Sequence, residues 1–173
     1  MECQLRKWRA EDTANLAAAL NNRNILKNLR DGLPYPYTKK DADDFIAAML
    51  GADADETYAF AIAVEDNVIG SIGAFRKDNI HRCTAEMGYY IAEPFWGKGL
   101  GTSAIQLMCR YLFGHTDLIR IFAEPFAYNL ASCRILEKNG FICEGTLRSN
   151  AVKDGKILDM RMYSLLKGDF NGA

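Results

Sequence analysis

Several features that would narrow the function are missing from this chain or scarce in it. Its 173 residues include two histidines and five cysteines without Cys-x-x-Cys spacing, so neither a zinc site nor a disulfide framework is expected. The formal net charge of -1 gives no basic field for nucleic acid. No apolar run reaches the roughly 18 residues that span a bilayer, and the first residues lack a signal-peptide hydrophobic segment. We therefore expect a cytoplasmic protein with no metal, and with neither nucleic acid nor a membrane as partner.

What is present is typical of an ordinary globular protein, with 49% hydrophobic and 25% charged residues. The sequence shows no internal repeat, low-complexity stretch or linker, and its length suits one domain. We expect residues 1–173 to form that single domain.

Hydrophobic periodicity and turn residues predict helices first, then a β-meander, and finally alternating strands and helices. We expect helices over 12–21, within 21–30, from the capping box at 38–41 to about 50, after 99, and over 129–138. We expect strands over 2–8, 58–64, 68–75, 83–92, 118–123, 141–147 and 157–165, with turns at Asp66-Asn67 and Asp154-Gly155. This order predicts an α/β or α+β fold with a mixed sheet.

The most informative motif lies at 94–104, where Gly97, Gly99 and Gly101 alternate ahead of an amphipathic helix. Glycines at a helix start leave backbone N–H groups free to bind a phosphate, and the helix dipole favours its negative charge. The spacing fits neither a Walker loop nor a Rossmann fingerprint. Two interpretations remain, a phosphate cradle of another kind or a tight strand-to-helix turn without a ligand.

A second segment, 129–141, reads Asn-Leu-Ala-Ser-Cys-Arg-Ile-Leu-Glu-Lys-Asn-Gly-Phe. Together the two segments resemble the GCN5-related N-acetyltransferase (GNAT) family. Its loop pattern is Gln/Arg-x-x-Gly-x-Gly/Ala, and its second motif contains Asn-x-x-Ser and Leu-Glu-Lys-x-Gly-Phe. Trp96 stands where that loop usually has Gln or Arg. The Pro-x-Trp-Gly-Lys-Gly form is most similar to the branch around the ribosomal-protein N-terminal acetyltransferases RimJ and RimL.

The resemblance implies a mostly antiparallel twisted sheet of about six to seven strands, helices on both faces, and a splayed parallel pair at 83–92 and 118–123. It also implies acetyl-CoA as a co-substrate, with its pyrophosphate on the glycine loop and an oxyanion donor at the backbone N–H of Tyr90 or Ile91. Two of the residues implied to bind the cofactor also have a structural interpretation: Lys98 as a solvated cation and Asn129 as the N-cap of a helix. The cofactor-binding residues implied are Tyr90, Ile91, Trp96, Gly97, Lys98, Gly99, Leu100, Gly101, Thr102, Asn129 and Ser132.

Acetyl transfer to an amine needs a base for the ammonium proton, a donor for the oxyanion and, less critically, an acid for the thiolate. By resemblance, Glu86 before the glycine loop is the first candidate for the base and Glu124 the second. Each also has a structural interpretation, Glu86 as an exposed strand residue paired with a cation and Glu124 as an acid before a proline turn. The position of the family's acid tyrosine is Leu136 here, so that role cannot be transferred; Tyr128, which adjoins the Asn129–Ser132 segment, is a candidate donor. Cys133 is expected to be a buried thiol rather than an acyl-enzyme nucleophile.

The implied function is an N-acetyltransferase in which a primary amine attacks the thioester directly. The acceptor is either a protein N-terminal α-amine or a small-molecule amine. A non-catalytic acyl-CoA sensor or scaffold with the same fold is the alternative, because the acid tyrosine is missing. The motifs leave both a monomer and a homodimer open.

Overall fold

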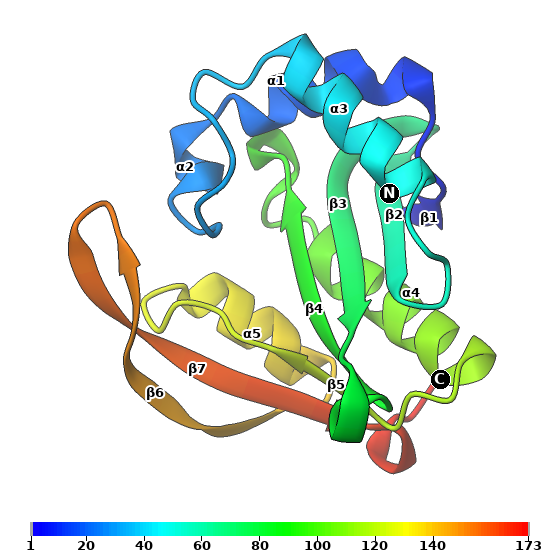
Figure 1. Cartoon of the computed structure of the whole chain (residues 1–173), viewed down its shortest axis with the longest axis vertical. Helices are drawn as coiled ribbons and strands as arrows, with labels where there is room; N and C mark the ends of the chain where they lie inside the picture. The colour runs from blue at the N-terminus through cyan, green and yellow to red at the C-terminus, as the bar shows by residue number, and fades with distance from the viewer. Residues whose placement is uncertain (1, 173) are drawn as a thin grey trace.

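The computed structural model describes residues 2–172. It contains a seven-stranded sheet in the order β1-β2-β3-β4-β5-β7-β6, in which β4 and β5 form a parallel pair (Figure 1). This mixed, mostly antiparallel sheet confirms the predicted fold class. Its strands are β1 (Gln4–Arg6), β2 (Thr57–Val64), β3 (Asn67–Arg76), β4 (Thr84–Ile91), β5 (Arg120–Ala123), β6 (Ile142–Lys153) and β7 (Lys156–Leu166).

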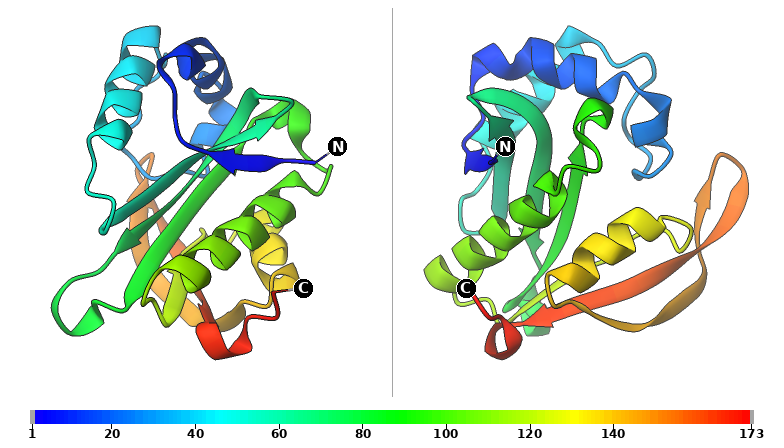
Figure 2. Two further views of the ribbon diagram at one scale, coloured as in Figure 1. Left: turned by 90° about the vertical axis from the view of Figure 1, so that its right-hand side faces the viewer. Right: turned by 180° about the vertical axis from the view of Figure 1, so that it is seen from behind.

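Helices cover both faces of the sheet, as predicted (Figure 2). α1 and α3 lie on one face with the short α2 beside them, whereas α4 and α5 lie on the other. In the part of the chain that the structure describes, no helix is long and apolar enough to cross a membrane. The bounds are α1 (Thr13–Leu20), α2 (Arg23–Leu26), α3 (Lys39–Leu50), α4 (Leu100–His115) and α5 (Leu130–Lys138).

The central strands are apolar without strict alternation because both of their faces are buried. Val68 of β3 packs in the cluster beneath α1 and α3, whereas Ile72 packs in the cluster beneath α4. Burial of these side chains between two helical layers supplies the main hydrophobic stabilisation of the fold.

Local signals at the helix and turn boundaries mostly act as predicted. The Thr38 backbone N–H donates to the Asp41 side chain over 2.7 Å, and the Asp41 backbone N–H donates to the Thr38 hydroxyl over 3.3 Å, which forms the capping box. Asp154 and Gly155 form the β6–β7 turn, with φ of 51° and 73°. The prediction of an Asp66-Asn67 turn was wrong. Asn67 pairs with Val64 as the first residue of β3, so the turn lies one residue earlier.

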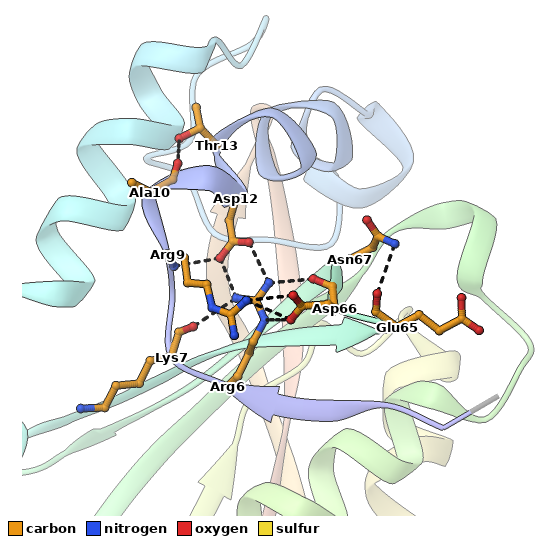
Figure 3. Close-up of polar contacts among 9 residues, drawn as sticks. All are labelled: Arg6, Lys7, Arg9, Ala10, Asp12, Thr13, Glu65, Asp66 and Asn67. Atoms are coloured by element: carbon orange, nitrogen blue, oxygen red, sulfur yellow. Dashed lines mark hydrogen bonds and ion pairs between the residues drawn. The ribbon is translucent and has the colours of Figure 1, made fainter.

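A network of ion pairs fixes the start of the chain to the β2–β3 turn (Figure 3). The Arg6 guanidinium donates two hydrogen bonds of 2.8 Å to Asp12, and the Arg9 backbone N–H donates a third of 2.9 Å. Burial raises the pKa of Asp12, but these three bonds more than offset it and hold that pKa below its ordinary value. Both arginines also pair with Asp66, which anchors β1 and the entry to α1.

The feature that positions the site is the divergence of β4 from β5. The two strands pair over Thr84–Glu86 and Arg120–Phe122, where Glu86 lies opposite Phe122. β4 then continues to Ile91 without β5 beside it, and β5 turns toward its antiparallel partner β7. Figure 1 shows the two strands diverging, with α2 beside the end of β4 at the open side of the gap. The splayed pair implied by the family resemblance is therefore present.

Candidate active site

The glycine loop joins β4 to α4 through two left-handed backbone positions. Gly97 has a φ of 73° and Gly99 a φ of 77°. Apart from the glycine itself and its two chain neighbours, no described residue has an atom within 4 Å of where a Cβ at either position would stand. Gly99 is the N-cap of α4, so the first N–H groups of that helix follow directly. The loop thus offers both the exposed N–H groups and the open space that a pyrophosphate needs.

Three other predicted cofactor-binding residues of this segment, Trp96, Lys98 and Thr102, differ in their contacts and in their exposure to solvent. Trp96 donates its indole N–H to the carbonyl of Ile91 over 2.6 Å, which closes the loop back on β4. The Lys98 ammonium lies 5.3 Å from the centre of the Phe95 ring, and its own charge is solvent-exposed. Thr102 is half-buried in the first turn of α4.

Leu100 and Gly101 serve packing at the start of α4. Leu100 is buried in the core beneath the helix. A Cβ on Gly101 would lie 3.2 Å from Cδ1 of Ile135, so the missing side chain lets α4 approach α5 closely. Sequence reasoning assigned both residues to the cofactor site, and the structure gives each of them a packing role as well.

The sheet register distinguishes the two candidate oxyanion donors. Ala92 donates its backbone N–H to Ile69 of β3 over 2.7 Å, and Tyr90 lies opposite Ser71 in the same antiparallel register. Because N–H directions alternate along a strand, the N–H of Tyr90 points toward β3 and that of Ile91 points toward the splayed side. Of the two, Ile91 therefore has the available donor.

The second motif begins α5 and meets the side chain of Tyr89. Asn129 caps the helix, since its side-chain oxygen accepts the Ser132 N–H over 3.2 Å. The Tyr89 hydroxyl lies 2.8 Å from the Ser132 hydroxyl. Burial raises the pKa of Tyr89 to about 12, so the phenol keeps its proton at neutral pH. Sequence reasoning missed Tyr89, although it is a hydroxyl one residue from a predicted site position. Cys133, in the same helix, is 2% exposed, so it is the buried thiol that the sequence predicts.

The two candidate bases line one cleft, although they come from different strands. The cleft has a volume of about 720 Å³, and its walls include Glu86 of β4, Glu124 after β5, and the aromatic rings of Phe122 and Phe126. Both glutamate side chains are 19% exposed. We call it the carboxylate cleft. Two half-buried carboxylates beside two aromatic rings suit the binding and deprotonation of an ammonium group.

Each carboxylate is paired with a cation. Arg30 contacts both Glu86 and Glu124, and Lys77 lies 3.5 Å from Glu86. The structural interpretation of Glu86 holds in part: the carboxylate pairs with cations, but its side chain is 19% exposed and does not lie on the open surface. Sequence reasoning missed Arg30, since nothing local marks a residue that lies 56 positions from the carboxylate it contacts.

Tyr128 lies at the edge of this arrangement. Its ring stacks on Phe126, with 5.5 Å between the ring centres, and its hydroxyl donates to the Lys27 carbonyl after α2. Burial raises the pKa of Tyr128. The hydroxyl would have to leave Lys27 before it could donate elsewhere, so its catalytic role stays a prediction.

Comparison with known proteins assigns the chain to a family. The family model described as the acetyltransferase (GNAT) domain matches residues 3–142. The chain belongs to the GNAT family. The N-acetyltransferase p20 of Bacillus licheniformis is 31% identical over 172 residues, which cover 97% of this chain and 94% of that protein.

Solved structures of acetyltransferases share the whole fold. RimL, a ribosomal L7/L12 α-N-protein acetyltransferase in complex with coenzyme A, superposes with a TM-score of 0.85 at 20% identity, over 96% of this chain and 94% of that one. A spermidine N-acetyltransferase from Vibrio cholerae, in complex with CoA and spermine, gives a TM-score of 0.81 at 24% identity, over 97% of each chain.

The GNAT assignment identifies the chain as an enzyme. It is an acetyl-CoA-dependent N-acetyltransferase whose acceptor is an amine. The family, with relatives that are named as N-acetyltransferases, favours catalysis over the sensor or scaffold alternative. The roles of the glycine loop, the splayed strands and the carboxylate cleft in that reaction are proposed below.

Proposed function

We propose that this GNAT enzyme acetylates a primary ammonium group in the carboxylate cleft, with Glu86 as the general base. One observation carries the proposal: Glu86 and Glu124 line the same cleft at the point where β4 and β5 diverge. A carboxylate there is close to the open edge of β4, where backbone N–H groups without a strand partner face the thioester. Glu124 is the second residue of this acceptor site, where it attracts the ammonium group.

We infer that acetyl-CoA lies along the splayed edge of β4, with its pyrophosphate on the loop from Trp96 to Thr102. The open space beside Gly97 and Gly99 and the first N–H groups of α4 support this placement. Lys98 adds a positive charge at the rim of the loop. Asn129 and Ser132 begin α5, and Ser132 and Tyr89 offer hydroxyls to the thioester end of the cofactor.

Acetyl-CoA supplies an activated thioester, and the residues of the chain handle the protons and the charge. Glu86 accepts one proton from the acceptor ammonium, which frees the nitrogen lone pair for attack. A backbone N–H on the open edge of β4 donates to the oxygen that becomes negative. A new carbon–nitrogen bond then replaces the carbon–sulfur bond. Of the two protons left on the nitrogen, one stays in the amide and the other passes to the CoA thiolate. Because a thiol has a pKa near 8.5, the donor, either Tyr89 or Tyr128, contributes less than the base.

The physiological acceptor is either a protein N-terminal α-amine or a small-molecule amine. The similarity in fold to RimL supports the first class, and the similarity to a spermidine N-acetyltransferase supports the second. We further propose a cytoplasmic enzyme that forms one domain over residues 1–173, whose end residues Met1 and Ala173 lie outside the described part, and that acts as a monomer or a homodimer.

A panel of acceptors, read by thiol release from acetyl-CoA, tests the function. The panel contains serine- and alanine-starting peptide amides, their N-terminally acetylated forms as matched controls, and spermidine. We expect release with at least one free amine and none with the blocked peptides. Release that does not depend on the amine would contradict the proposal.

A further inference from the structure

Arg30 occupies the space between the two carboxylates of the cleft. The same guanidinium nitrogen, Nη2, contacts Oε1 of Glu86 and lies 3.5 Å from Oε2 of Glu124. One cationic N–H group thus bridges side chains from the two diverging strands. This is the arrangement that an acceptor ammonium would need in order to lose a proton to Glu86.

The segment that carries Arg30 is held in place at several points. Its start is tied to the residue before the glycine loop, since Asn22 and Asn24 donate to Glu93 over 2.6 and 3.0 Å. Its middle accepts the hydrogen bond from Tyr128, and Asp31 pairs with Lys153 of β6 over 2.8 Å. The backbone that carries Arg30 is therefore positioned by contacts to Glu93 and Tyr128, the residues just before the two motifs, and to the β6–β7 hairpin.

Arg30 itself is held less firmly than its backbone. Its side chain is 61% exposed, and ion pairs with so much solvent exposure contribute little free energy and open readily. Lys77, the other cation near Glu86, lies farther from it at 3.5 Å and over the Phe122 ring. Arg30 can thus leave the carboxylates while the rest of the segment stays bound.

We propose that the Arg30 guanidinium stands at the position of the acceptor's ammonium group and that the acceptor must displace it. This inference rests on the proposed function, and it adds a residue that determines specificity. A cationic amine restores the lost ion pairs with Glu86 and Glu124. A neutral nucleophile leaves Glu124 without its cation and Glu86 with Lys77 alone, which is unfavourable for half-buried carboxylates. Arg30 therefore selects acceptors that arrive as cations and opposes neutral ones.

The kinetic test compares Arg30→Ala and Arg30→Gln with the wild type, and uses Lys39→Ala as the matched loss of a cation outside the cleft. With the panel amine that turns over fastest, we expect KM for the amine to fall about two- to fivefold in both Arg30 variants. In these variants no guanidinium group occupies the ammonium position, so the amine has nothing to displace. We expect kcat and the affinity for CoA to change less than twofold. An unchanged or raised KM for the amine would overturn the proposal, because Arg30 would then help to bind the acceptor.

A structural test works without turnover. Crystals of Arg30→Ala grown with guanidinium chloride should show guanidinium between Glu86 and Glu124, whereas matched crystals grown with sodium chloride should not. In solution, guanidinium should compete with the amine more strongly in Arg30→Ala than in the wild type at equal ionic strength. An empty space between the carboxylates at a guanidinium concentration that does not unfold the variant would refute the proposal. A wild type that acetylates no amine would contradict the proposed function alone.

Discussion

Replacing Gly99 with alanine separates the two roles that the glycine loop can have. Gly99 has a φ of 77°, and a Cβ there would meet no atom within 4 Å. The loss of stability therefore comes from backbone strain, about 1–2 kcal/mol for an L-residue in the left-handed region. For a chain of this size that corresponds to a fall in Tm of about 2–8 °C. If the loop were a turn without a ligand, Gly99→Ala would lower the stability by this amount and leave CoA binding unchanged.

Gly155→Ala is the matched control, because Gly155 has a φ of 73° and equally open space but lies in the β6–β7 turn. Both variants should lose similar stability in a thermal melt. Only Gly99→Ala should weaken CoA binding, by about tenfold or 1.4 kcal/mol, since strain at the N-cap misaligns N–H groups that face a phosphate. Calorimetric titration with CoA measures this difference. Equal CoA affinity in the two variants would refute the phosphate role of the loop.

Two further predictions concern groups with shifted pKa values. Asp12→Asn should lower the free energy of unfolding at neutral pH by about 2–3 kcal/mol, because the buried Arg6 guanidinium loses the carboxylate that accepts its two 2.8 Å hydrogen bonds and keeps only the exposed Asp66 as an ionic partner. Since the folded-state pKa of Asp12 is lowered, the carboxylate stabilises the fold above its unfolded pKa of 3.8 and loses this effect as pH falls further. The difference between variant and wild type in urea denaturation should therefore shrink in acid, and a constant difference would contradict the ion-pair account. Tyr89→Phe should lower kcat less than tenfold, because the thiol leaves readily, and should leave the acceptor KM unchanged; a loss above a hundredfold would make Tyr89 an essential acid.

Features encoded by neighbouring residues could be predicted from the sequence. The alternating glycines and the capping box at Thr38 act within a few residues of chain, so their patterns suffice. The β2–β3 turn was misplaced by one residue, because Asp66 and Asn67 both tolerate the left-handed region. The pairing of β3 with β2 determines which residues form the turn, since it places Asn67 opposite Val64.

The cleft could be predicted only in part. Glu86 and Glu124 were identified as alternatives for one role, yet no local pattern shows that they face the same space. That depends on β4 and β5 pairing for three residues and then diverging. Arg30 and Tyr89 were missed for the same reason, since their contacts with Glu86 and Ser132 span 56 and 43 residues of chain.

The central claim is that Glu86 removes the acceptor proton in an acetyl-CoA-dependent reaction. The most direct test is the rate of amine-dependent thiol release by Glu86→Gln, with Glu124→Gln measured beside it and CoA affinity measured for both. The account predicts a loss of about 10²–10⁴-fold in kcat for Glu86→Gln with unchanged CoA affinity, and a smaller loss in kcat with a raised amine KM for Glu124→Gln. A loss of less than tenfold in Glu86→Gln would contradict it.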